Sequence, residues 1–237
     1  AAFDFVPVFL AKSLEWSIYI LNKIINAIAS LEQFIIRDIP FNWTILISLY
    51  LLIISLVLWF KKPSFKKLLL ALMTVIILQI TYFETHWTNQ SQKEFVIFHS
   101  KKNTLITERN GENSTLFAND SLLKTASKNK TLISYLMGNF SHLKSKKKLQ
   151  NTLYFQDKRI LVLDSLGVYP KNSTPDIVVL TQSPKINLER MFQTLKPEMV
   201  VADGSNYSTY ISLWETTCLK MKIPFHATGE KGFYRLD

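Results

Sequence analysis

The sequence predicts a membrane α-helical segment, made of an amphipathic helix and a transmembrane helical hairpin, followed by an α/β domain with a mixed sheet. Three observations support this fold class. The first residues alternate polar and apolar positions at helical spacing, two uncharged apolar runs flank a lysine-rich loop, and the remainder alternates strand and helix patterns. The corresponding segments are residues 1–41, 42–90 and 91–237.

Composition limits the kinds of protein to consider. The 237 residues are 48% hydrophobic, which is enough for one large or two modest domains. The single cysteine, Cys218, excludes an internal disulfide and a metal site built from thiolates. The chain begins Ala1-Ala2-Phe3 without a signal-peptide pattern, so we expect a segment of a longer protein or one trimmed at its start.

Residues 1–41 have the pattern of one long amphipathic helix, with polar residues mostly three or four apart and a wide apolar face. Asp38-Ile39-Pro40 ends the helix, because the residue before a proline is disfavoured in the α region. Two interpretations remain open. The helix belongs to the core of a bundle, or it lies in a membrane interface or lines a channel.

Two apolar runs follow, Thr44–Phe60 and Leu68–Phe83, and neither contains a charge. Each is slightly shorter than the ~20 residues that span a bilayer, and tryptophan or tyrosine flanks both, as interfacial aromatics do. The connector, residues 61–67, contains four lysines. It predicts a transmembrane hairpin with a cytoplasmic loop, which places the chain after about residue 88 on the outer face. The alternative is a buried hairpin in a soluble protein.

Residues 91–237 have the pattern of an α/β domain. Asn110-Gly111 is typical of a hairpin turn, and Asp157-Lys158 marks a second one. Antiparallel hairpins followed by βαβ units predict a mixed sheet with helices packed on it. We expect strands at 95–99, 104–108, 114–118, 151–156, 159–163, 177–181, 198–202, 223–228 and 232–236, and helices at 131–142, 187–195 and 207–221.

The turn from Asp203 to Asn206 joins a predicted strand to a predicted helix. Backbone amides at such a helix start can bind phosphate or carboxylate, so Gly204, Ser205 and Asn206 are candidate anion contacts. A simpler interpretation is that Gly204 permits a tight turn and that Ser205 or Asn206 caps the helix.

Lysines are concentrated between residues 124 and 148, where no acid occurs between Asp120 and Asp157. This stretch is suited to DNA phosphates, which are bound without regard to base sequence. It is equally suited to anionic lipid head groups or to a solvated surface, and the sequence leaves these alternatives open. The candidate DNA contacts are Lys144, Lys146, Lys147 and Lys148.

Residues 200–236 read VVADGSNYSTYISLWETTCLKMKIPFHATGEKGFYRL. This tail resembles the end of the ComEC family of competence proteins, which carry single-stranded DNA through the inner membrane. Many members end in a metallo-β-lactamase-like domain. That domain closes with a strand, a glycine–asparagine turn, a helix, a strand ending in threonine and a glycine-containing strand. The matching segments here are residues 203–206, 207–221, 225–228 and 231–233, and the helix, break and hairpin before them resemble the last membrane portion of the family's competence region.

The resemblance implies a site at the strand ends, but this chain departs from the family's ligands. Active members place Ser-His-His-Gly where this chain has Thr181-Gln182-Ser183-Pro184, and an aspartate-rich segment where it has HSKKNT at 99–104. Glutamine and serine are poor ligands for zinc or manganese, and no two of the four histidines have the spacing of a ligand pair. We expect a degenerate, metal-free domain without catalytic residues or cofactors. The vestigial site position comprises Asp164, Gln182, Ser183 and Asp203.

The leading hypothesis is the C-terminal part of a competence membrane protein that takes part in uptake of single-stranded DNA across the inner membrane. Its terminal domain would be non-catalytic, on the outer face, and would guide DNA or brace the channel. Expected partners are single-stranded DNA, membrane lipids, the remainder of the channel protein upstream of Ala1, and competence proteins of unknown identity. Two alternatives are a metal-dependent nuclease that degrades one DNA strand and a membrane-anchored structural module unrelated to DNA.

Overall fold

The structure, a computed structural model, describes residues 8–30, 40–170 and 173–237. It divides into two units, Ala1–Ile39 and Pro40–Asp237. The described part of the first unit is a single helix, α1 (Val8–Ser30), with exposed apolar side chains such as Trp16. The predicted continuation of this helix over 31–39 lies outside the described residues.

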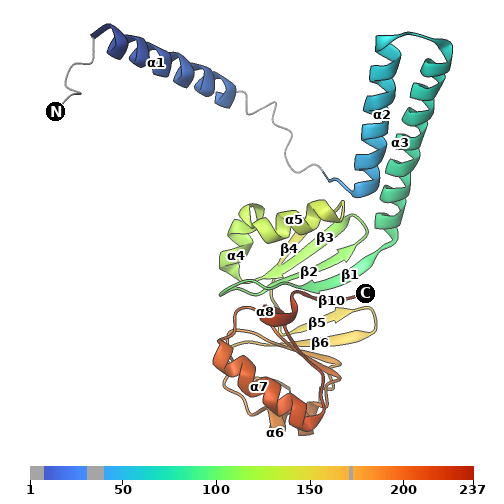
Figure 1. Ribbon diagram of the computed structural model, residues 1–237. Coiled ribbons are helices and arrows are strands. Elements are labelled where there is room, and N and C mark those ends of the chain that lie inside the picture. The colour runs from blue at the N-terminus through green and yellow to red at the C-terminus, as the bar shows by residue number, and fades with distance from the viewer. Residues whose placement is uncertain (1–7, 31–39, 171–172) are drawn as a thin grey trace. The chain divides into compact units, whose positions relative to one another are not determined.

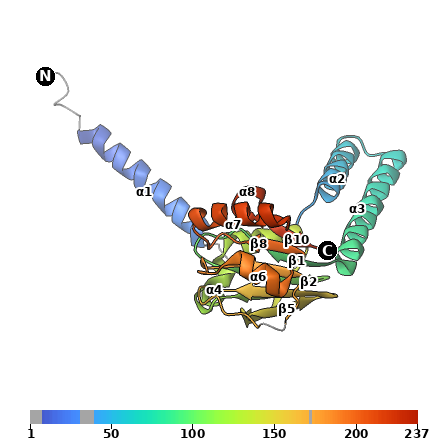
Figure 2. The same cartoon turned by 90° about the horizontal axis from the view of Figure 1, so that it is seen from below.

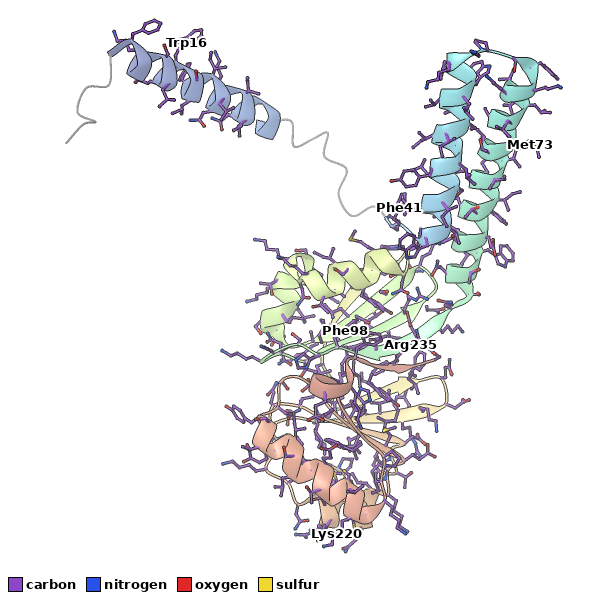
Figure 3. The ribbon with its side chains drawn as sticks, viewed as in Figure 1. Trp16, Phe41, Met73, Phe98, Lys220 and Arg235 are labelled. Carbon is purple, nitrogen blue, oxygen red and sulfur yellow. The ribbon has the colours of Figure 1, made fainter. Side chains whose placement is uncertain are left out.

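The second unit begins with an antiparallel helical hairpin, α2 (Trp43–Lys61) and α3 (Phe65–Ser91) (Figure 1). Both helices are long and apolar enough to cross a membrane by length and composition. Small residues fill the space between them, and the hydroxyl oxygens of Ser55 and Thr74 lie 2.8 Å apart in a buried hydrogen bond. Large apolar side chains such as Met73 project outward (Figure 3). Small interhelical residues and outward apolar ones are typical of helix pairs in lipid.

The first of two five-stranded sheets has the order β10-β1-β2-β3-β4. Its first four strands pair antiparallel, whereas β4 is parallel to β3. Two helices and a 3-10 turn connect β3 to β4. The strands are β1 (Lys93–Ile97), β2 (Leu105–Asn110), β3 (Asn113–Ala118), β4 (His142–Lys148) and β10 (Tyr234–Leu236), and the connection is α4 (Asp120–Thr125), η2 (Ala126–Lys128) and α5 (Lys130–Gly138).

The second sheet has the order β5-β6-β7-β8-β9, in which β5 is antiparallel to β6 and the other neighbours are parallel. A short helix then returns the chain to the first sheet, where β10 pairs with β1. The elements are β5 (Thr152–Phe155), β6 (Lys158–Leu163), β7 (Ile177–Leu180), α6 (Leu188–Leu195), β8 (Met199–Ala202), α7 (Ser208–Met221), β9 (Phe225–Ala227) and α8 (Thr228–Lys231).

Three buried clusters hold these layers together. One lies between the sheets, where Phe95 and Phe117 meet Ile160 and Val179. A second joins the first sheet to α4 and α5, and a third joins the second sheet to α6 and α7. The domain is therefore a four-layer α/β/β/α arrangement, with α4 and α5 on one side and α6 and α7 on the other (Figure 1). Figure 2 views the domain from the side of α6 and α7.

Most predicted elements are confirmed within one to three residues, but three predictions are wrong. The strands form two mixed sheets instead of one. The predicted helix 131–142 ends at Gly138, because Phe140 adopts a left-handed backbone with φ 51° that breaks the helical path. Residues 142–148 form β4, a strand that the prediction lacked because HLKSKKK has no apolar alternation.

Candidate functional site at the strand ends and along β4

The carboxyl ends of β6, β7 and β8 meet at one edge of the second sheet, because these strands are parallel. The turn after β7 is attached to the turn after β8 by two backbone donors. The Gln182 amide donates to Ser205 Oγ and the Ser183 amide donates to Asn206 Oδ1, each at 2.7 Å. Both donor residues have positive φ, 59° and 54°, so this connection maintains a strained turn.

Asp203 lies at the centre of this connection and is fully buried. Its Oδ1 accepts hydrogen bonds from the Ser205 amide (3.0 Å), the Ser205 hydroxyl (2.5 Å) and the Asn206 side-chain amide (3.0 Å). Burial raises the pKa of Asp203 to about 6, and the Ser205 hydrogen bonds oppose that rise. Among the described residues Oδ2 has no partner with hydrogen-bond geometry, although the buried Thr104 hydroxyl is near enough to lower the pKa.

Glycine is required at position 204 because neighbouring atoms lie too close to allow a side chain, and not because of its backbone conformation. A Cβ at this position would lie 2.7 Å from His99 Nδ1 and 2.9 Å from the Ser100 nitrogen. The loop after β1 therefore crosses directly over the turn after β8. The same ring nitrogen, His99 Nδ1, lies 3.4 Å from the Thr228 hydroxyl oxygen.

The prediction that Ser205 or Asn206 caps the following helix is wrong. The residue before α7 is Tyr207, and no side chain caps the helix there. The two polar side chains instead accept the amides of the turn after β7, and the Ser205 amide itself donates to Asp203. Of the three candidate anion contacts, Ser205 and Asn206 therefore have structural partners within the turn.

Asp164, at the end of β6, accepts a hydrogen bond from the Leu166 amide at 3.0 Å, which makes it a turn residue. It also lines a cavity of about 230 Å³ together with Gln182. The other walls come largely from the ends of β3 and β4 in the first sheet. They are Asn119, Asp120, Lys148, Leu149, Gln150, Asn151 and Val162.

The predicted vestigial position is therefore divided by the fold. Asp164 and Gln182 line the cavity, whereas Ser183 and Asp203 are buried in the connection between the turns. Within the described ranges, no three His, Cys, Asp or Glu side chains gather closely enough to hold a metal ion. Two of the histidines have other contacts, His86 with Glu112 and His226 with the Gly232 carbonyl.

Strand β4 presents the densest lysines at the edge of the first sheet, and all four of these side chains are exposed. The pairing with β3 shifts between Ser114 and Thr115, which leaves Lys144 as the extra residue of a bulge. Lys147 lies over the Phe117 ring at 5.8 Å, and Lys148 pairs with Asp120 at 3.0 Å. In the described chain Lys144 and Lys146 have no ion-pair partner. Bulges and lysines also protect an open edge against pairing with another sheet.

The sequence did not connect the lysines to the strand ends, but the fold does. Because β4 is parallel to β3, it ends at Lys148 beside the cavity that Asp164 and Gln182 also line. The signal that points to this arrangement is a helical segment between two strands, which implies a parallel crossover.

A known protein family matches the sequence of this domain. The family model of the ComEC C-terminal domain matches residues 95–237, from within β1 to the last residue. The chain belongs to the ComEC family. The predicted resemblance is thereby confirmed, and the ComEC match covers both sheets with all their helices. No curated protein and no solved structure matches the chain.

Membership of the ComEC family has three coarse consequences. The family is one of competence DNA uptake, it is membrane-associated, and it implies DNA handling within a larger channel protein. The two apolar helices, α2 and α3, precede the ComEC C-terminal domain, and a single residue, Gln92, separates α3 from β1.

Proposed function

We propose that this chain is the C-terminal part of a channel protein for single-stranded DNA and that its α/β domain holds the DNA without cutting it. The observation that carries the proposal is β4, an exposed edge strand with lysines at 144, 146, 147 and 148. At about 3.3 Å per residue, seven strand residues extend over roughly 23 Å. That length is sufficient for several backbone phosphates to meet lysines at once, without any base being read.

A non-catalytic role is supported by how the polar groups at the strand ends are used. Where active relatives place histidines, Gln182 and Ser183 hold the turn to Ser205 and Asn206 through their backbone amides. The four-layer arrangement supports descent from a metallo-β-lactamase-like scaffold whose ligands were lost. The cavity beside Asp164 and Gln182 then serves as the end of a DNA-holding surface. Lys148 pairs there with Asp120, so the phosphates are held along β4 by Lys144, Lys146 and Lys147.

Membrane insertion of the hairpin is part of the proposal. Its outward-facing apolar side chains and its small interhelical residues support a lipid environment. The lysines of the 61–67 loop favour a cytoplasmic position for that loop. The α/β domain is then on the outer face of the inner membrane. The functional division is residues 1–41 as an interfacial or channel helix, 42–90 as the hairpin and 91–237 as the DNA-holding domain.

An equilibrium titration of the full chain in nanodiscs with a fluorescent single-stranded oligonucleotide tests the proposal. We expect binding at low salt that weakens steeply as salt rises, because lysine–phosphate contacts release counterions. The oligonucleotide should remain intact throughout. Absence of binding at low salt would contradict the DNA-holding role.

A further inference from the structure

Three exposed lysines outside β4 form a second group, on the helical layer of the first sheet. Lys124 lies in the last turn of α4, Lys128 ends η2 and Lys130 begins α5, and all three are exposed. The only acid in these three elements is Asp120, which pairs with Lys148 of β4. The outer face of α4, η2 and α5, here called the basic helical face, therefore carries a net positive charge.

This face lies on the side of the first sheet toward which the hairpin extends (Figure 1). From the interfacial Trp87 to Lys93, the first residue of the domain, the chain advances about 9 Å at 1.5 Å per helical residue. A head-group layer is roughly 5–8 Å thick on each side of the hydrocarbon, and the Debye length at physiological salt is about 8 Å. Figure 1 shows α4 and α5 on the side of the first sheet toward which the hairpin extends, with α5 lying across the hairpin's direction.

Buried polar contacts fix α5 against the end of α3. Arg109, fully buried in β2, pairs with Glu94 at 3.0 Å and donates to the carbonyl of Asn139, directly after α5, at 2.9 Å. The same guanidinium donates to Asn89 Oδ1, in the last turn of α3, at 3.5 Å. Tyr135 of α5 donates its hydroxyl to Glu94 at 2.7 Å. Burial, and then this hydrogen bond, raise the pKa of Tyr135, so the phenol stays protonated as a donor.

Two further contacts attach the β2–β3 turn to α3 and to Gln92, the residue after it. His86 lies 2.8 Å from Glu112, and the Gly111 amide donates to the Gln92 carbonyl at 2.8 Å. Because the helix, the turn and α5 share these contacts, the domain cannot rotate freely about Gln92. The side of the domain that faces the lipid is set by the fold.

We propose that the basic helical face binds anionic lipid head groups and holds the α/β domain against the membrane surface. The inference rests on the proposed insertion of the hairpin. It divides the lysine-rich stretch between two ligands, because the lysines of β4 are left for DNA and those of α4, η2 and α5 bind lipid.

Site-directed fluorescence on the full chain tests this inference. An environment-sensitive thiol dye is attached at Ser134→Cys, an exposed position of α5, and the chain is reconstituted into phosphatidylcholine vesicles with or without phosphatidylglycerol. Cys218 is buried and burial raises the pKa of its thiol to about 12, so it should not react with the dye. The expected result is quenching by nitroxide head-group lipids in the anionic vesicles. A dye at Ser212→Cys, exposed on α7, should not be quenched.

Charge reversal identifies the lysines responsible. Each lysine near an anionic surface adds about a fivefold preference for it. The junction with α3 still orients the domain, so Lys124→Glu, Lys128→Glu and Lys130→Glu together should reduce quenching at position 134 in anionic vesicles toward its value in phosphatidylcholine alone. The matched control, Lys144→Glu with Lys146→Glu, should leave it unchanged.

A third dye position separates this inference from the proposal on which it rests. Leu58→Cys, on the outward face of α2, reports insertion of the hairpin. Quenching by lipid at 58 without quenching at 134 would overturn the lipid contact and leave insertion standing. If lipid quenches neither position, insertion and the head-group contact both fail.

Discussion

Arg109 and Glu94 form an ion pair of 3.0 Å whose side chains are 0% and 7% exposed, at the point where α3 joins the first sheet. A buried ion pair of this kind adds little net stability, but removing one partner destabilises the fold strongly because the other charge stays buried. The pair therefore marks the position at which the hairpin and the α/β domain depend on each other.

The first prediction concerns this pair. Arg109→Ala should lower the free energy of unfolding by about 3–5 kcal/mol, because the buried Glu94 loses its closest cation and keeps only the Tyr135 hydroxyl and Arg235 at 4.0 Å. The measurement is denaturant unfolding of the full chain in detergent micelles. The double variant Arg109→Met with Glu94→Gln should recover part of the loss, since no unpaired charge remains. A loss below about 1 kcal/mol for Arg109→Ala would show that solvent reaches the junction.

The second prediction is a pH dependence from Asp203. Its folded pKa, about 6, lies above the ordinary value of 3.8, so the folded state favours the protonated form. The resulting stabilisation is complete below about pH 4 and is lost as the pH rises through 6. Its size is up to about 3 kcal/mol. Chemical denaturation between these pH values should show wild-type stability falling relative to Asp203→Asn, which cannot ionise. Parallel pH profiles for the two proteins would rule out this ionisation.

The third prediction concerns the glycine beneath His99. Gly204→Ala should destabilise the domain by about 1–3 kcal/mol, because the new Cβ collides with the Ser100 backbone as well as with the imidazole. Gly138→Ala is the matched control, since nothing lies within 4 Å of its Cβ position in α5. That change should be neutral or stabilise by up to about 1 kcal/mol. The measurement is thermal unfolding, and equal effects of the two changes would contradict the close approach.

The fourth prediction separates the DNA-holding role from a nuclease. With manganese or zinc present, the full chain should leave end-labelled single-stranded and double-stranded DNA uncut, as judged on a denaturing gel. The metal content of the purified protein should be substoichiometric. Cleavage that a chelator stops, accompanied by one or more bound ions per chain, would establish the nuclease alternative.

The parts of the fold that the sequence predicts are those with a local signal. The hairpin α2–α3 follows from charge-free runs around a lysine loop, and β7 and β8 follow from short apolar runs before turns. The division into two sheets has no local signal, because the pairing of β10 with β1 joins segments more than a hundred residues apart in sequence. Strand β4 was missed because an edge strand needs little apolar surface.

The candidate site, like the fold, is predictable from the sequence only where the signal is local. Parallel strand order predicts that Gln182 and Asp203 lie near each other, since the ends of β7 and β8 share an edge. The role of Ser205 and Asn206 as acceptors for the turn after β7 depends on hydrogen bonds between distant loops, which spacing cannot reveal. The proximity of Lys148 to Asp164 and Gln182 likewise required the sheets to be packed face to face.

The most direct test of the central claim is the salt dependence of single-stranded DNA binding by the full chain with Lys144→Glu and Lys146→Glu. Each lost phosphate contact should reduce the slope of log K against log salt by about 0.7. The double variant should therefore bind more weakly, and its slope should be less steep by about 1.4. The matched control Lys185→Glu with Arg190→Glu, exposed positions near and within α6, should keep the wild-type slope. Equal slopes for wild type and both variants would show that β4 does not hold the DNA.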